Sequence, residues 1–227
     1  MKQVTVATLK LCGGHPALDF TNTVHARGPR FGPDVLRDDD DLLRWSVRIG
    51  LLDATEVEGV RRIQVAEGVR RTPAVEGVPR MQAAEGRSVL ERAKTLREAL
   101  HRIFATPGLP AADDLDLLSR TACAAQQSRV LVRVADGYAW RWRDGDPDTV
   151  AHRIALAAAD LLTSPRVGRV RVCAGENCGW LFLDTSRSGR RVWCSEETCG
   201  TRTRVRRWRS KEAGGADGGR TAGPQRQ

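Results

Sequence analysis

The sequence predicts an α+β fold, with a mostly helical N-terminal domain that carries one β-hairpin, followed by a small module that contains four cysteines. Three observations support this prediction. Apolar residues recur every three to four positions in several segments of the first 164 residues, which is typical of amphipathic helices. The pattern changes to alternation over residues 130–142, which is typical of a hairpin. Four of the six cysteines lie between residues 173 and 199.

The first 53 residues are expected to form a strand, a turn and a helix. Residues 4–9 (VTVATL) are rich in β-branched side chains, which favours a strand. Glycine and proline at 13–16 mark a turn. Residues 34–50 have apolar side chains at helical spacing, and Gly50 is expected to end that helix. The acidic run at 38–41 indicates the positive end of the helix dipole rather than a metal site.

Residues 54–87 contain an internal repeat in which a Glu-Gly pair recurs every nine residues. The copies begin at Glu58, Glu67, Glu76 and Glu85. Nine residues at about 100° each place successive copies on opposite sides of a helix, so the repeat forms no continuous apolar stripe. The repeated glycines, together with Pro73 and Pro79, weaken a helix further. We therefore expect a poorly ordered segment or a broken helix.

Two helices are expected after the repeat. Ser88 and Glu91 form a capping-box signature for the first helix, which the Thr-Pro-Gly sequence at 106–108 is expected to end. The second helix is expected over residues 113–126. Cys123 lies beside its apolar face and is expected to be a small core residue.

A β-hairpin and a third helix complete the N-terminal domain, which is expected to span residues 1–164. Side chains alternate over 130–134 and again over 138–142, and an Asp-Gly pair between them supplies the turn. The aromatic face of the hairpin is expected to pack in the core rather than to stack on nucleobases. The third helix is expected to begin at Pro147 and to end before the next Ser-Pro pair.

The C-terminal cysteines are arranged as two close pairs. Cys173 and Cys178 form one C-x4-C pair, Cys194 and Cys199 form the other, and fifteen residues separate the pairs. Two such pairs suit a tetrahedral Zn²⁺ with four thiolate ligands. Two disulfides are the alternative, which a chain without an export signal does not favour. Because four thiolates leave no open coordination position, the sequence predicts one structural zinc per chain rather than a catalytic one.

Excess positive charge is concentrated beside the cysteines. Residues 165–227 contain fourteen basic and six acidic residues, a net +8, whereas residues 1–164 contain 23 and 22. A basic module on a neutral body is typical of a protein that binds a polyanion. The first ten residues include no long apolar run, so we expect no signal peptide, no membrane partner and a cytoplasmic location.

Short elements surround the cysteines in a recognisable order. A strand is expected at 180–183 and a turn at 186–189, and the second cysteine pair leads into a basic helix over 201–211. A cysteine knuckle, a hairpin and a cysteine pair at a helix start together resemble a treble clef. The module is expected to span residues 165–212, and residues 213–227 are expected to be disordered because of their composition.

Two parts of the chain each resemble a known family. CGWLFLDTSR and RRVWCSEETCGTRTRVRR are similar to the CGNR zinc finger, while GGHPALDFTNT and DLLRWSVRIGLL are similar to the ABATE domain of stress-induced transcription regulators. The resemblance places the family's metal ligands on Cys173, Cys178, Cys194 and Cys199. The motif that gives the finger its name falls on residues 199–202, where Thr201 replaces the usual asparagine, and Glu196 replaces a common methionine. The resemblance implies a role in transcription, and the Thr201 exchange removes any base contact or cap made by that asparagine.

Arginines on and before the C-terminal helix are the candidate nucleic-acid contacts, because guanidinium groups bind phosphate or guanine bidentately. The candidates are Arg187, Arg190, Arg191, Arg202, Arg204, Arg206, Arg207, Arg209 and Lys211. Val205 and Trp208 point in another direction and are expected to dock on the zinc core. Two alternatives remain open for this helix: a solvated basic helix without a ligand, and a helix that binds an acidic protein.

A second group of polar residues lies near the N-terminus. Its members are His15, Asp19, Asn22, His25 and Arg27. They could line a pocket for a small-molecule effector, or they could cap a turn and satisfy buried backbone groups. The sequence contains no glycine-rich phosphate loop, nucleophile elbow or His-x-x-x-His motif, so we do not expect an enzyme.

These observations leave three functional hypotheses. The first is a transcription regulator that binds DNA through the zinc module, with an N-terminal domain that senses a ligand or forms an oligomer. The second is an RNA-binding or ribosome-associated zinc protein. The third is a small-molecule-binding protein or enzyme whose finger is a structural appendage.

Overall fold

The structure, a computed structural model, describes residues 4–28, 32–70, 88–106 and 110–215, with side chains described outside 64–70 and 211–215. In this part of the chain the α-helices are α1 (Pro16–Thr21), α2 (Asp39–Arg48), α3 (Ala54–Arg70), α4 (Val89–Ala105), α5 (Ala112–Gln127), α6 (Thr149–Thr163) and α7 (Thr201–Gly215). The strands are β1 (Arg129–Val134), β2 (Gly137–Trp142), β3 (Val170–Val172) and β4 (Leu181–Leu183). Two short helical turns are η1 (Pro165–Arg169) and η2 (Glu196–Gly200). The predicted α+β fold is confirmed.

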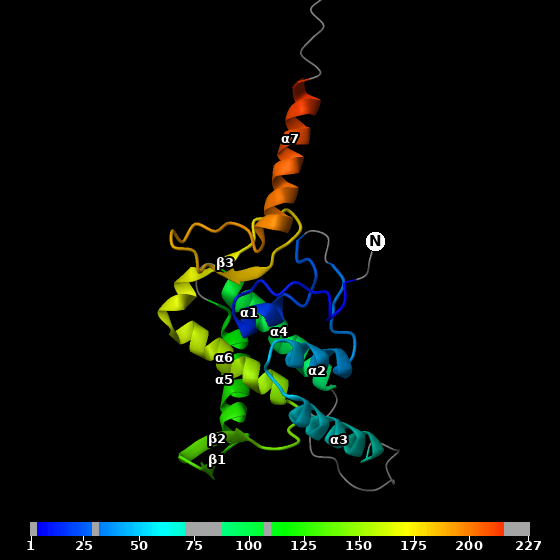
Figure 1. Ribbon diagram of the computed structural model, residues 1–227, viewed down its shortest axis with the longest axis vertical. Helices are drawn as coiled ribbons and strands as arrows, with labels where there is room; N and C mark the ends of the chain where they lie inside the picture. Colours follow the sequence, from blue (N-terminus) through cyan, green and yellow to red (C-terminus); the bar gives the residue numbers. More distant parts are fainter. Residues whose placement is uncertain (1–3, 29–31, 71–87, 107–109, 216–227) are drawn as a thin grey trace, which may run out of the picture.

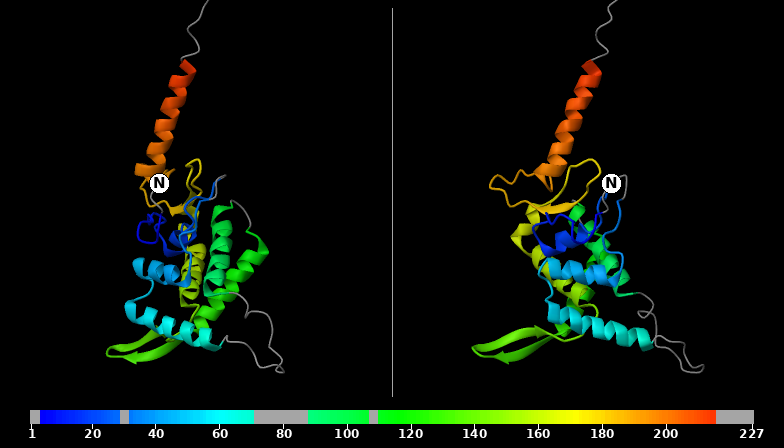
Figure 2. Two further views of the ribbon diagram at one scale, coloured as in Figure 1. Left: turned by 90° about the vertical axis from the view of Figure 1, so that its right-hand side faces the viewer. Right: turned by 45° about the vertical axis from the view of Figure 1, so that its right-hand side comes forward.

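The helices pack into a body from which two elements extend at opposite ends (Figure 1). Helix α4 packs against α1, α5 and α6, and strands β3 and β4 both contact α4. The antiparallel hairpin β1–β2 leaves the body at one end and α7 leaves it at the other, and two turned views show the same separation (Figure 2). The antiparallel pair β3–β4 therefore connects the body to the C-terminal module.

One apolar core extends from the helical body into the cysteine module. Phe20 and Trp45 are fully buried, with ring centroids 5.2 Å apart. Trp180 and Phe182, which belong to the C-terminal module, are buried in the same cluster. Burial of each such side chain contributes about 1.5–3 kcal/mol. The N-terminal domain and the zinc module expected from the sequence therefore share a core.

Helix α4 begins where its capping-box signature predicts, whereas α2 begins at Asp39, within the acidic run and five residues after the expected start at residue 34. The Asp38 carboxylate accepts a hydrogen bond from the Asp41 backbone N–H at 2.7 Å and so caps α2. Ser88 and Glu91 form the predicted capping box at α4, with hydrogen bonds of 3.2 Å and 2.9 Å. Gly50 follows α2 with a φ of +70°, a left-handed conformation that glycine adopts without strain.

The prediction of a strand at residues 4–9 is wrong. This segment forms a turn in which the Thr5 N–H donates to the Thr8 hydroxyl at 2.9 Å and the Leu9 N–H donates to the Thr5 carbonyl at 2.9 Å. Threonine hydroxyls offer the backbone this local alternative to a sheet. Val6 and Leu9 are both buried, so the segment contributes to the core without pairing with a strand.

The first half of the repeat forms the continuous helix α3, which corrects the expectation of a broken helix over residues 54–70. Val57 and Val60 are buried against the body, and ion pairs join Glu56 to Arg153 and Arg61 to Asp40. These contacts offset the cost of the glycines, which is about 1 kcal/mol each. Residues 71–87 lie outside the described part of the chain.

The β1–β2 hairpin forms where the sequence predicts, although its turn is at residues 135–136 rather than at the expected Asp136-Gly137 pair. Two of its aromatic side chains are exposed. Leu131 pairs with Trp140 and Arg133 pairs with Tyr138, and the side chains of Tyr138 and Trp140 are 74% and 56% exposed. The expectation that this face is packed core is therefore wrong. The hairpin extends away from the body (Figure 1), and only its base is covered, where Arg153 lies 4.8 Å from the centre of the Trp142 ring. Cys123, expected in the core, is also exposed.

A buried ion-pair network joins the loop before α2 to α4. The Arg97 side chain is only 4% exposed and donates two hydrogen bonds of 2.9 Å to the Asp34 carboxylate. It also donates to Glu98, which forms a second ion pair with the equally buried Arg27 at 2.6 Å. Buried guanidinium groups are stable only when paired in this way, so these contacts fix the loop against the helix.

We expect Asp34→Asn to lower the free energy of unfolding at pH 7 by about 2–4 kcal/mol, because it removes one of the two carboxylates that pair with the buried Arg97. Burial alone would raise the pKa of Asp34, but the contact with Arg97 holds it below its usual value. The ion pair therefore stabilises the fold fully above the unfolded pKa of about 3.9 and is lost as the pH falls through the lower folded pKa.

Urea unfolding of wild type and Asp34→Asn at pH 7 and pH 3 tests this expectation. The stability difference between the two proteins should shrink as the pH falls. Asp116→Asn is the control, because its ion pair with Arg120 is exposed and is expected to contribute no more than about 1 kcal/mol. A difference between Asp34→Asn and wild type that is the same at both pH values would contradict the assignment.

Candidate metal centre and basic helix

Four cysteine side chains from two loops meet at the surface of the body. The Sγ atoms of Cys173, Cys178, Cys194 and Cys199 all lie within 4.8 Å of one another. Cys194 Sγ lies 3.6 Å from the Sγ atoms of both Cys178 and Cys199. Zinc–sulfur bonds of about 2.3 Å in a tetrahedron require sulfur atoms about 3.8 Å apart. The donor set therefore fits one structural Zn²⁺, as the sequence predicts.

The backbone around the cysteines is shaped for this cluster. A side chain at Gly175 would bring its Cβ within 3.1 Å of Cys199 Sγ, so the knuckle requires glycine there. The Cys194 N–H donates to Cys173 Sγ at 3.2 Å, a contact that stabilises a thiolate. The single π-helical turn η2 carries Cys199, whose N–H bonds to the Ser195 carbonyl at 3.0 Å.

Because the thiols lie close together, their pKa values shift in different directions. Hydrogen bonding with Cys12 and with the other cysteines raises the pKa of Cys194, and burial raises the pKa of Cys199. Hydrogen bonds from Cys178 and Cys194 lower the pKa of Cys173 to about 2. Adjacent thiols cannot all ionise unless a cation neutralises them, so metal binding at this cluster releases protons. Cys12 is distant in the sequence, and its place beside Cys194 was not predicted.

Helix α7 leaves the cluster and extends into solvent (Figure 1). Its exposed arginines are Arg202, Arg204, Arg206, Arg207 and Arg209. Arg204 pairs with Glu196 and Arg206 pairs with Glu176, while the other three have no carboxylate partner among the described residues. Lys211 also lies in α7, and its side chain is outside the described part. The helix therefore presents several guanidinium groups at once.

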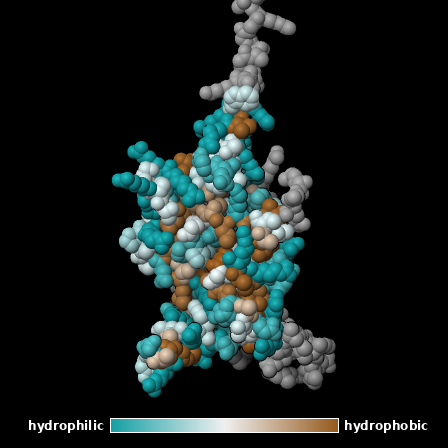
Figure 3. All heavy atoms as spheres, in the orientation of Figure 1, coloured by the Kyte–Doolittle hydropathy of each residue, from teal (hydrophilic) through white to brown (hydrophobic). Residues whose placement is uncertain are grey.

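Two further expectations for this region need correction. Val205 and Trp208 do not dock on the zinc core, since they are 42% and 59% exposed. The reason is that α7 packs mainly on η2 and extends beyond the body, where it is mostly hydrophilic (Figure 3). Residues 213–215, which were expected to be disordered, belong to α7, because this helix continues to Gly215. Residues 216–227 lie outside the described chain.

The loop arginines differ in role. Arg187 and Arg190 are exposed. Arg191 turns inward, where its Nε donates to the Trp193 carbonyl at 2.8 Å and its guanidinium lies 4.5 Å from the centre of the Phe182 ring. Arg191 therefore supports the loop that carries Cys194, whereas the other two are available to a ligand.

Glu196 and Thr201, the two residues that differ from the finger's usual sequence, both contact Arg204. The Thr201 hydroxyl donates to the Glu196 carbonyl at 3.2 Å and accepts a hydrogen bond from Arg204 at 3.3 Å. The Glu196 carboxylate also pairs with Arg204 and lies over Gly200, where a Cβ would come within 2.8 Å of it. These contacts connect η2 to the first turn of α7.

The polar residues near the N-terminus do not converge on one pocket. His15 caps α1 by accepting from the Ala17 N–H at 3.3 Å, and Asp19 accepts from the Gly13 N–H at 2.8 Å. Arg27 belongs to the buried ion-pair network, and its N–H donates to the Cys178 carbonyl at 2.7 Å. These residues satisfy turns and backbone groups, which is the second interpretation offered by the sequence.

Asn22 ties the body to the cysteine module. Its side chain is fully buried and forms two hydrogen bonds with Leu181, donating to the carbonyl at 2.8 Å and accepting from the N–H at 2.9 Å. Nearby, Trp180 Nε1 donates to the Val24 carbonyl at 2.7 Å. The amide therefore completes the open edge of β4, a role that only an amide side chain fills with both bonds.

We expect Asn22→Ala to lower the free energy of unfolding by about 2–4 kcal/mol, because it leaves two buried backbone groups of Leu181 without partners. Urea unfolding monitored by tryptophan fluorescence measures this loss. Gln126→Ala is the control, since Gln126 is exposed and its removal should change stability by less than about 0.5 kcal/mol. Equal stability of the two variants would refute the role of Asn22.

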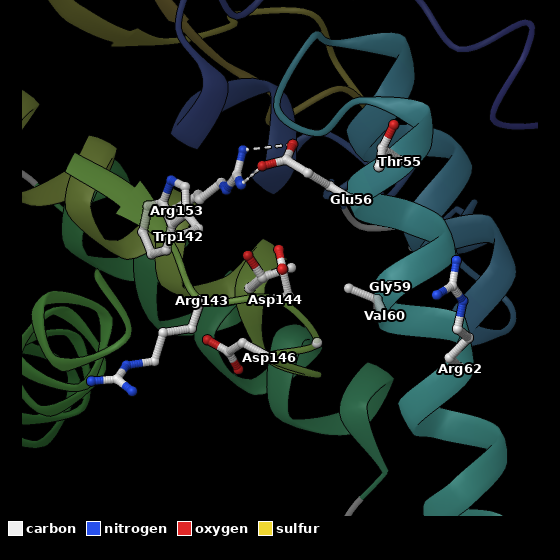
Figure 4. Close-up of a pocket in the computed structure, with 12 residues that line it drawn as sticks. Thr55, Glu56, Gly59, Val60, Arg62, Trp142, Arg143, Asp144, Asp146 and Arg153 are labelled. Carbon is white, nitrogen blue, oxygen red and sulfur yellow. Dashed lines mark hydrogen bonds and ion pairs between the residues drawn. The ribbon is translucent and has the colours of Figure 1, made fainter. Parts of the chain in front are cut away.

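Two hollows occur in the described part of the chain. The smaller, about 190 Å³, lies between α3 and the loop that follows β2 (Figure 4). Several of its charged groups form ion pairs: Glu56 binds Arg153, and Asp146 binds His152 at 2.6 Å. The ion pair between Glu56 and Arg153 holds α3 in place, and we do not consider this hollow a candidate site. The larger, about 730 Å³, lies beside the cysteine cluster and includes His25 in its wall.

Comparison with known protein families shows to which family the chain belongs. Residues 14–165 match ABATE, described as a putative stress-induced transcription regulator. The chain belongs to the ABATE family. Residues 169–212 match the CGNR zinc finger, so the four cysteines fall inside a zinc-finger region. Both resemblances drawn from the sequence are thus confirmed.

Two further comparisons are brief. A search of curated proteins finds no significant match. None of the helices described combines the length and the apolar character that crossing a lipid bilayer requires.

Proposed function

We propose that this ABATE protein is a transcription regulator that binds DNA through α7, and that it is a binding protein rather than an enzyme. One observation carries the proposal: α7 presents exposed arginines away from the body while its first turn is fixed at the cysteine cluster (Figure 2). The family description supports a role in transcription.

The cysteine cluster positions the helix. When bound, Zn²⁺ supplies a structural crosslink between the knuckle and η2. The chain adds its own restraints, since Thr203 donates to the Cys199 carbonyl at 2.9 Å and Thr201 bonds to η2. A fixed first turn orients the arginines before binding, so less conformational entropy is lost when they meet phosphates.

The size and charge of α7 suit the DNA major groove. Its 15 residues span about 22 Å, and the groove is about 12 Å wide, which admits a helix. Arg202, Arg206 and Arg209 recur at the spacing of one helical face and can reach phosphates or guanine edges. The major groove of A-form RNA is deep and narrow and does not admit side chains in this way, which favours DNA over RNA.

Fluorescence anisotropy with the zinc-loaded full-length chain tests the proposal. The ligands are a 30-bp duplex DNA and an RNA hairpin of similar charge, each measured between 50 and 200 mM salt. We expect tighter binding to DNA and a loss of about 10³-fold in affinity across this salt range for six or more phosphate contacts. Tighter binding to RNA would favour the RNA-binding hypothesis, and no binding to either would refute the proposal.

A further inference from the structure

The larger cavity lies between the N-terminal body and the start of α7. Three segments that are distant in the sequence contribute to its wall: residues 4 and 8–10, residues 25–26 with Gly32, and parts of residues 175–206. Its volume of about 730 Å³ is within the range of about 300–1,000 Å³ found for small-molecule sites. Three of the four zinc-binding cysteines, Cys178, Cys194 and Cys199, also line this space, so it adjoins the metal centre.

One wall of the cavity is apolar and aromatic. Val4, Leu9 and Trp180 contribute to it, and Trp180 is held by its hydrogen bond to the Val24 carbonyl at 2.7 Å. Because the indole N–H is used in that bond, the ring offers the cavity an apolar surface. The His25 ring stands edge-on to Trp180 with centroids 6.2 Å apart. A flat, apolar ligand group fits such a wall.

The wall also contains cationic side chains, but their charges are not equivalent. Lys10 pairs with Glu197 at 3.3 Å, and Arg206 pairs with Glu176. Arg202 lines the cavity and has no carboxylate partner among the described residues. One unpaired guanidinium selects for a ligand with a single negative charge, and its fork geometry matches a carboxylate.

His25 supplies a second polar group to the cavity. Its Nδ1 atom is buried and has no hydrogen-bond partner in the described part of the chain. The cavity therefore meets the other atoms of the ring, and a ligand contacts these atoms rather than Nδ1. Burial, and then the nearby charge of Arg202, lowers the pKa of His25, so the neutral ring adds no charge at pH 7.

We propose that this cavity binds a small organic monocarboxylate with an aromatic or other flat apolar group. The apolar group lies against Trp180, and the carboxylate binds Arg202 beside His25. The two ends of the ligand then contact different parts of the protein: the apolar group contacts Trp180, and the carboxylate contacts Arg202 on α7.

The consequence for regulation rests on the proposed function. Arg202 is both the carboxylate partner in the cavity and one of the arginines assigned to DNA. A bound carboxylate therefore competes with a phosphate for the same guanidinium, and occupancy of the cavity weakens DNA binding.

Isothermal titration calorimetry of the zinc-loaded full-length chain with 2-naphthoate tests the site without DNA. We expect a dissociation constant of about 1 mM or tighter, as is usual for a ligand of this size. The neutral isostere 2-naphthamide should bind at least about tenfold more weakly. Arg202→Gln should weaken naphthoate binding at least about tenfold, whereas Arg202→Lys keeps the positive charge and should retain most of the affinity. Arg209→Gln is the control, because Arg209 is on the same helix but outside the cavity, and it should bind naphthoate as wild type does.

Three outcomes would overturn the site: no saturable binding of naphthoate up to about 10 mM, equal binding of the amide, or equal loss in Arg202→Gln and Arg209→Gln. Adding naphthoate to the anisotropy assay then tests competition. Reduced DNA affinity with naphthoate but not with naphthamide supports it, and unchanged DNA affinity at saturating naphthoate overturns it. If the protein binds no DNA at all, the proposed function fails while calorimetry still decides the site.

Discussion

Replacing Arg202, Arg206 and Arg209 together with alanine is expected to weaken duplex DNA binding by about 100-fold or more at 0.15 M salt, because three phosphate contacts are lost. The slope of log affinity against log salt should fall by about 3 units, at about 0.9 per contact. The bound zinc should stay at one per chain, since none of the three side chains is a ligand of the cysteine cluster. Anisotropy titrations and metal analysis measure these quantities.

A matched triple variant separates position from net charge. Arg62, Arg120 and Arg133 are exposed and lie on α3, α5 and β1, at the end of the molecule opposite α7 (Figure 1). Changing all three to alanine removes the same charge, and only a small loss of DNA affinity is expected. Equal weakening by the two triples would show that DNA binding depends on overall charge, and the assignment of α7 would be wrong.

Local signals in the sequence predicted much of the fold. The start of α4 depends on a capping box between Ser88 and Glu91, which is confirmed. The four zinc-binding cysteines were found for the same reason, because each pair is close in the sequence and only one spacer separates them. In each case the interaction is encoded by neighbours along the chain.

Errors arose where a residue's neighbours come from distant segments. Alternation in the β1–β2 hairpin predicted which side chains share a face, but it carried no information on what covers that face, and Trp140 is exposed. Val205 and Trp208 were expected to dock because apolar residues on a helix usually pack, yet α7 extends past any partner in the described structure.

The same reason explains what the sequence could not reveal at the sites. The partner of Asn22 is 159 residues away at Leu181, and Arg97 meets Asp34 across 63 residues. The cavity is formed by three segments, and the finger motif in the third does not indicate that the other two lie beside it. Pairings of this kind depend on the completed tertiary structure, so no local pattern of polar residues specifies them.

Cys194→Ser is expected to abolish stoichiometric zinc binding and to lower the free energy of unfolding by at least about 4 kcal/mol, because the metal's binding energy contributes to folding. Cys194 is the most connected member of the cluster, with Sγ atoms of Cys178 and Cys199 at 3.6 Å. Its loss leaves three thiolates and disconnects the knuckle from η2. Metal analysis and urea unfolding measure both effects.

The loss should be concentrated in η2 and α7. Helices of about 12–15 residues are marginal in water by themselves, so α7 should fray once its first turn is no longer fixed, and the helical circular dichroism signal should fall. Strands β3 and β4 should persist, because Asn22, Trp180 and Phe182 anchor them in the shared core. Hydrogen exchange should therefore increase in residues 195–215 more than in 170–183.

Cys123→Ser is the matched control, since Cys123 is exposed and lies far from the cluster in α5. It should keep its zinc, its helical signal and its stability to within about 0.5 kcal/mol. A chelator added to wild type should reproduce the behaviour of Cys194→Ser, because both remove the same crosslink. If Cys194→Ser keeps its helical signal and binds DNA as wild type does, then the cysteine cluster does not position α7, and the proposed role of the zinc is wrong.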